Sequence, residues 1–145
     1  MTRREALGRL FDGMRADMED YRVLRGLLEE QFVAALGHRT EEIGLAVERI
    51  LTVTTTLKQR SRERVQLAAA LAGGKVKRVT MRAVSARLPP QTRQNFDARW
   101  SVLEGLVQEC KRLNARNGHL LMTQREIMQR VLNTEVDTYA PAVST

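Results

Sequence analysis

The sequence predicts an all-α protein: an antiparallel three-helix bundle, similar to a coiled coil, with a short connector helix and a flexible C-terminal tail. Aromatic residues make up 4% of the 145 residues, and proline occurs three times. This composition, rich in Leu, Ala, Arg, Glu and Gln, favours helices. Apolar residues recur at steps of three and four along three long stretches, which is the spacing of one helix face. The first two stretches are joined by a short turn at 37–39, and helices joined in this way pack antiparallel.

The periodic stretches predict helices at about 3–36, 40–72 and 91–133, with a short helix at 81–88, all within one domain at 1–133. Gly37 ends the first helix, because glycine tolerates the left-handed C-cap conformation. Thr80 can cap the short helix, and the prolines at 89 and 90 stop it, because a residue before proline is disfavoured in a helix. Residues 134–145 show no period, and we expect a flexible tail there.

Two asparagines, Asn114 and Asn117, fall on the predicted inner stripe of the third long helix. Amides in a helical core cost stability unless they are hydrogen-bonded, and they often fix the register of packing. One interpretation is therefore a register-setting core pair. The other is a groove that recognises the backbone of a partner. Arg64 is a second polar anomaly, because it lies where the stripe of the second helix should be apolar.

Beyond Gly118 the third long helix becomes apolar over a wider arc than one seam needs. Flexible apolar side chains such as Met suit surfaces that accept varied helical partners. Either the first two helices cover this arc, or the third helix, which is the longest, projects past them and leaves it open. An open arc could bind a partner helix or support a homodimer. The arc consists of Leu120, Leu121, Met122, Ile127, Met128, Val131 and Leu132.

The net charge of +7 is concentrated in one stretch, residues 58–93, which contains ten basic side chains and one acidic side chain. It could be a solvated helix end, or a surface for an acidic protein, an anionic membrane or nucleic acid. No aromatic residue for base stacking lies in it, which argues against nucleic acid. A small basic nucleic-acid-associated regulator and a structural helical adaptor remain alternatives. The candidate basic patch consists of Lys75, Lys77, Arg78, Arg82 and Arg87.

Signals for an enzyme or a metal site are weak. Neither His38 nor His119 has a Cys or carboxylate at ligand spacing, and a zinc site needs three or four ligands. Cys110 and His119 would lie about 13.5 Å apart along one helix, too far for a nucleophile–base pair. We therefore expect no enzymatic activity, no metal, no cofactor and no small-molecule substrate. A single cysteine, with no apolar run long enough for a membrane helix and no signal peptide, indicates a cytoplasmic protein.

The segment at 113–121, Leu-Asn-Ala-Arg-Asn-Gly-His-Leu-Leu, resembles the signature of the FlgN family, the flagellar export chaperones for hook–filament junction proteins. The segment at 138–141, Thr-Tyr-Ala-Pro, resembles the tail of that family. The resemblance implies that the chain holds the amphipathic C-terminal segments of FlgK and FlgL without a cofactor. It also implies that Tyr139 docks on the export gate protein FlhA. The matching substrate positions are Asn114, Asn117, Leu120 and Leu121, to which the apolar pattern adds Ile127, Met128, Val131 and Leu132.

Overall fold

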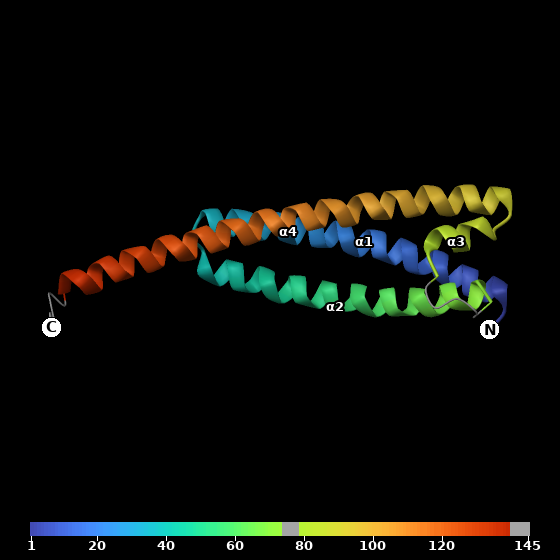
Figure 1. Ribbon diagram of the computed structural model, residues 1–145, viewed down its shortest axis with the longest axis horizontal. Coiled ribbons are helices and arrows are strands. Elements are labelled where there is room, and N and C mark those ends of the chain that lie inside the picture. The colour runs from blue at the N-terminus through green and yellow to red at the C-terminus, as the bar shows by residue number, and fades with distance from the viewer. Residues whose placement is uncertain (74–78, 140–145) are drawn as a thin grey trace.

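The computed structural model describes residues 1–73 and 79–139, and within them it contains helices and no strand. The helices are α1 (Arg3–Leu36), α2 (Thr40–Leu71), α3 (Met81–Ala86) and α4 (Pro90–Tyr139). Three long helices pack against one another with α3 as the short connector (Figure 1). The predicted all-α bundle is therefore confirmed.

The central helix of the bundle is α1, which packs against both α2 and α4. Among the described residues, no Cα atom of α2 lies within 8 Å of one in α4. α2 runs antiparallel to α1, whereas α4 runs parallel to it (Figure 1). Hydrogen bonds between α1 and α4 join residues 84 to 89 apart in sequence, so the two helices keep one register along the C-terminal half of α1. Side chains of α2 and α4 nevertheless share both buried core clusters, Ala68 with Leu103 in one and Leu57 with Cys110 and Leu113 in the other.

The seam of α4 against α1 alternates steps of three and four, the repeat of a coiled coil. The buried side chains on it are Leu103, Leu106, Cys110, Leu113 and Asn117. Asn114 is exposed, so its predicted place on the inner stripe is wrong. It lies one residue past the seam position of Leu113, which turns its side chain out of the α1–α4 contact.

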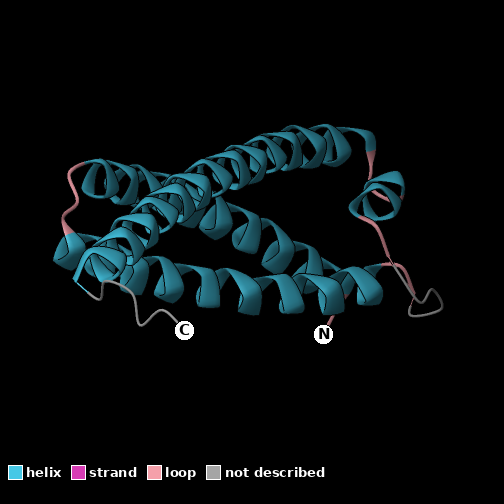
Figure 2. Cartoon of the chain, turned by 60° about the vertical axis from the view of Figure 1, so that its left-hand side comes forward, coloured by secondary structure: helices cyan, strands magenta, loops and turns pink. Residues whose placement is uncertain are grey.

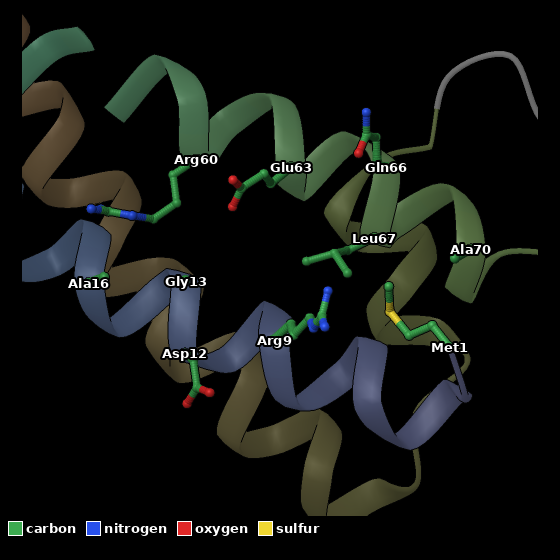
Figure 3. A pocket seen from close by; sticks show the side chains of 10 residues that line it. All are labelled: Met1, Arg9, Asp12, Gly13, Ala16, Arg60, Glu63, Gln66, Leu67 and Ala70. Atoms are coloured by element: carbon green, nitrogen blue, oxygen red, sulfur yellow. The ribbon is translucent and has the colours of Figure 1, made fainter. Parts of the chain in front are cut away.

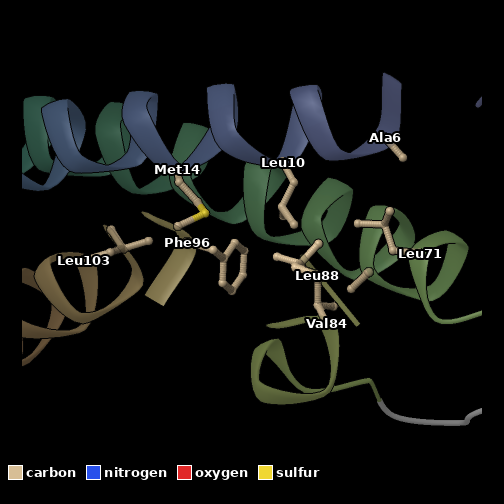
Figure 4. Close-up of a cluster of buried hydrophobic side chains, with 9 residues drawn as sticks. Ala6, Leu10, Met14, Leu71, Val84, Leu88, Phe96 and Leu103 are labelled. Carbon is tan, nitrogen blue, oxygen red and sulfur yellow. The ribbon is translucent and has the colours of Figure 1, made fainter. Parts of the chain in front are cut away.

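The larger of the two buried core clusters lies at the end of the bundle that holds α3. Phe96 of α4 is 1% exposed and meets Leu10 and Met14 of α1 in a cluster that α2 and α3 complete (Figure 4). The rings of Phe11 and Phe96 are 5.9 Å apart and nearly perpendicular, a favourable aromatic geometry. A second cluster, containing Leu24, Leu57 and Cys110, continues the core toward the α1–α2 turn.

The helix ends differ in detail from the sequence-based expectations. Gly37 has a φ of −86°, and the left-handed residue in the α1–α2 turn is His38, with a φ of 54°. Thr80 caps α3 as predicted, with Ala83 N donating to its hydroxyl at 3.1 Å. α3 ends at Ala86 rather than residue 88, and the guanidinium of Arg93 donates to the carbonyls of Ser85, Ala86 and Leu88, as the free carbonyls at a helix end require.

The far end of α4 projects beyond the turn that joins α1 to α2 (Figure 1), and this end is drawn as helix (Figure 2). The helix continues past the predicted end at Asn133 to Tyr139, so the tail predicted to begin at 134 is helical for its first residues. No Pro or Gly interrupts α4 between Gly118 and Tyr139. We refer to residues 120–132 of α4 as the arm.

Candidate functional site

The arm carries an exposed apolar face. Its large apolar side chains are 49% to 61% exposed, and Leu120 and Leu121, at its base, are partly buried. Soluble proteins rarely leave a contiguous face of this kind uncovered unless it binds something. The exposed members are Ile127, Met128, Val131 and Leu132 on one side of α4, and Met122, which is turned about 140° from Ile127 around the helix.

The arm is uncovered because α1 ends before it does. Gln124 Nε2 donates to the carbonyl oxygen of Ala35 at 2.8 Å, and α1 ends at the next residue, Leu36. Ile127 and Val131 continue the three–four spacing of the seam beyond this point, where α1 no longer lies opposite. The face on the arm is thus the continuation of the α1–α4 interface.

Exposed apolar side chains concentrate at this end of the molecule. Of the fourteen large ones in the described residues, ten lie either on the arm or between Val33 and Leu51, around the α1–α2 turn. Scattered exposed apolar residues need no explanation, but a cluster at one end indicates an interaction surface.

The two asparagines of the 113–121 segment are not brought together on one surface. Asn117 is 1% exposed, and its amide donates to the carbonyl oxygen of Leu28 at 2.7 Å and to Gln31 Oε1 at 2.9 Å. Its own oxygen accepts from Arg116 Nε at 3.2 Å. Every one of these partners lies in α1 or beside Asn117 in α4, which supports the register-setting interpretation for Asn117. Asn114 lies on the exposed side of α4.

We expect Asn117→Ala to lower the free energy of unfolding by about 1–3 kcal/mol, because it leaves the buried amide of Gln31 without its partner. Asn114→Ala is the matched control and should change stability by less than about 0.5 kcal/mol, as exposed substitutions do. Urea denaturation followed by circular dichroism measures both. Equal effects of the two substitutions would contradict the buried role of Asn117.

The anomalous Arg64 belongs to a buried ion-pair cluster between α1 and α2. Asp17, 1% exposed, pairs with Arg64 and with Arg60, the latter at 2.7 Å. Arg60 also pairs with Asp20 at 2.6 Å. The guanidinium of Arg64 lies over the Trp100 ring, 5.4 Å from its centroid, and burial lowers its pKa. The sequence interpretation missed Asp17, although its place between Met14 and Tyr21 is a seam position.

Several basic side chains of the stretch at 58–93 therefore bind groups within the protein itself. Arg60 and Arg64 pair with carboxylates of α1, and Arg93 holds the α3–α4 connection through three carbonyls. Of the predicted basic patch, Arg82 and Arg87 are exposed. The remaining members, Lys75, Lys77 and Arg78, lie outside the described residues.

One recess in the described part of the chain is lined by charged and polar side chains. The recess in Figure 3 lies between α1 and α2, and its lining includes Arg9 and Asp12 of α1 and Glu63 and Gln66 of α2. In the described part of the chain, no group of three or more His, Cys, Asp or Glu residues could hold a metal ion. None of the helices in these residues is both long and apolar enough to cross a membrane.

The single cysteine is a core residue. Cys110 is 4% exposed, and its thiol donates to the carbonyl oxygen of Tyr21 at 3.4 Å. Burial raises the pKa of this thiol, so it stays protonated at neutral pH and is a weak nucleophile. His119, on the same helix, is exposed.

Tyr139 is the last residue of α4. Its side chain lies outside the described part of the structure, and so does the remainder of the 138–141 segment from Ala140 onward. The backbone of Tyr139 lies at the end of the projecting helix that is farthest from α3 (Figure 1).

Comparison with known proteins identifies one family. A family model described as FlgN protein matches residues 1–135, which is nearly the whole chain. Neither a curated protein nor a solved structure matches the chain. A match of this extent includes the three long helices and the arm together. The chain therefore belongs to the FlgN family of flagellar export chaperones.

Proposed function

We propose that the chain acts in the cytoplasm and binds the amphipathic C-terminal segments of the hook–filament junction proteins FlgK and FlgL. It then delivers them to the export gate. The observation that carries this proposal is the apolar face of the arm, which continues a helix-packing seam past the end of α1. A seam of this spacing fits a partner helix whose apolar residues recur at steps of three and four.

Burial of the apolar side chains of the arm can supply enough free energy for a reversible complex. Full burial of a Val-, Leu-, Ile- or Met-sized side chain contributes about 1.5–3 kcal/mol. The five arm side chains are already about half covered, so a partner helix gains several kcal/mol before the cost of ordering it is subtracted. Methionines at 122 and 128 can adapt to more than one partner sequence, as a chaperone with two substrates needs.

Co-purification tests the proposal. Tagged chain should retain co-expressed FlgK or FlgL from the same organism, because their C-terminal segments cover the arm. The control is FlgK with its C-terminal segment removed, which should not be retained. Equal retention of the full-length and shortened proteins would contradict binding through that segment.

Tyr139 is proposed to serve a separate step, docking on FlhA. Tyrosine suits this role because its ring contributes a large contact area at low cost in conformational entropy. We expect Tyr139→Ala to leave the affinity for the FlgK segment unchanged within about twofold and to weaken docking on the cytoplasmic domain of FlhA by at least about tenfold. Biolayer interferometry with both ligands measures the two affinities. Loss of FlgK binding in this variant would contradict the division of roles.

A further inference from the structure

We propose that the arm binds two antiparallel helices of its partner segment, joined as a helical hairpin. On the arm, the hairpin takes the place that α1 and α2 occupy beside α4 in the bundle. This inference rests on the proposed function, namely that the arm binds amphipathic helices. It adds how many helices the segment contributes and where each of them lies.

The first argument is the regular register between α1 and α4. Three hydrogen bonds between these helices each join residues that are 89 apart in sequence. They run from Cys110 to Tyr21, from Asn117 to Leu28 and from Gln124 to Ala35. Ile127 and Val131 lie three and seven residues past Gln124, which keeps them on the side that α4 turns toward α1. One partner helix would therefore lie on the line of α1, beyond its end at Leu36.

The second argument is that α4 also contacts α2, on a neighbouring side of the helix. Arg64 of α2 lies over the ring of Trp100, and Val107, seven residues further along α4, lines a recess with the same arginine. Steps of seven continued from Val107 reach Leu121 and Met128 on the arm. These two side chains therefore lie on the side of α4 that contacts α2 in the bundle.

The third argument is the width of the apolar face. Ile127 and Leu132 are turned about 140° from each other around α4, at about 100° per residue, and Val131 and Met128 lie between them. These four side chains are 49% to 58% exposed. A seam for one partner helix is narrower, because it uses two positions of every seven. A face of this width is typical of a helix that packs against two others.

The arm has room for both partner helices, because it lies beyond the turn that joins α1 to α2 (Figure 1). At this end of the bundle, α4 continues where the other two long helices stop. The apolar face at 121–132 is about 18 Å long at a rise of about 1.5 Å per residue. Each helix of a matching hairpin therefore needs about 12 residues, and the hairpin would restore three-helix packing along the arm.

Division of the FlgK segment tests the number of helices. The intact C-terminal segment of FlgK from the same organism and its two halves are titrated separately into the full chain by isothermal calorimetry. We expect each half to bind at least about 30-fold more weakly than the intact segment, because each half covers only one side of the arm. A half that keeps the affinity of the intact segment within about threefold would overturn the hairpin and leave the proposed function intact. If the intact segment does not bind, both fail.

Photo-crosslinking locates the two helices and covers the case in which division cuts through one continuous helix. Crosslinkers are placed at Ile127 and at Leu132, one at a time, and the captured residues of the intact segment are mapped by mass spectrometry. These two positions are about 7.5 Å apart along α4, which one helix spans with about five residues. We expect the two sets of crosslinks to lie more than about ten residues apart in the segment. Sets that lie closer together would overturn the inference.

Met122 is the matched control position for the crosslinkers. It is 61% exposed, but it is turned about 140° from Ile127, away from Met128 and Leu132. We expect a crosslinker at Met122 to capture no part of the segment, and capture there would contradict the placement on the apolar face. Capture of a second copy of the chain from Leu132 would put that copy in the place of one helix and would also overturn the hairpin.

Discussion

Replacing Asp17 with alanine is expected to lower the free energy of unfolding by about 3–5 kcal/mol, the cost of removing one partner from a buried ion pair. Asp17 is 1% exposed and pairs with both Arg60 and Arg64. Its loss leaves the guanidinium of Arg64, whose side chain is 15% exposed, without its carboxylate. Because total stabilities of domains this size are about 5–15 kcal/mol, the variant should be close to unfolding at ambient temperature.

Guanidinium denaturation with circular dichroism detection measures this loss. Glu19→Ala, an exposed acidic position of α1, is the control and should change stability by less than about 0.5 kcal/mol. The double variant Asp17→Leu with Arg64→Leu should recover part of the loss, because replacing a buried ion pair by apolar side chains is often neutral. A loss below about 1 kcal/mol for Asp17→Ala would place the cluster among solvated surface pairs.

A carboxylate in the arm is expected to have the largest effect on binding. Met128→Asp and Leu121→Asp should each weaken the binding of the FlgK segment by about 30-fold or more. This is the effect of losing an interface hot spot of about 2 kcal/mol or more. Met128 is 58% exposed, so its substitution leaves the fold intact. The helical signal in circular dichroism should therefore be unchanged while the affinity, measured by fluorescence anisotropy, falls.

Val102→Asp is the matched control for this experiment. Val102 is also an apolar residue of α4, 49% exposed, but it lies near the α3 end and not on the arm. We expect the Val102 variant to bind as the unmodified chain does. If Val102→Asp and Met128→Asp weakened binding equally, the partner would be recognising general charge or the whole of α4 rather than the arm.

Most of the fold follows from the sequence because its determinants are local and periodic. The three–four spacing of apolar residues predicts helices that the structure contains. Gly37, Thr80 and the two prolines predict where these helices begin or end. What spacing could not predict is which flank of a seam faces outward. Asn114 and Asn117 are three residues apart and both compatible with one stripe, yet only Asn117 meets α1. That difference depends on where α1 packs against α4, and the spacing of residues along one helix does not determine this tertiary contact.

The candidate site was also predictable only in part. The wide apolar arc after Gly118 is visible in the sequence, and its exposure follows once α1 is known to end at Leu36. The buried pairing of Asp17 with two arginines of α2 was not predicted, because the basic residues appear in sequence as one solvated block. Only the packing of α2 on α1 shows that Arg60 and Arg64 face inward.

Titration of the C-terminal segment of FlgK from the same organism into the full chain, followed by isothermal calorimetry, tests the central claim most directly. The account predicts one segment per chain at a micromolar or lower Kd, corresponding to about −8 kcal/mol or more, with a negative heat-capacity change from burial of the apolar arm. Met128→Asp should abolish the heat of binding under the same conditions. Absence of binding at tens of micromolar, or binding that Met128→Asp leaves unchanged, would contradict the claim that the arm holds the junction protein.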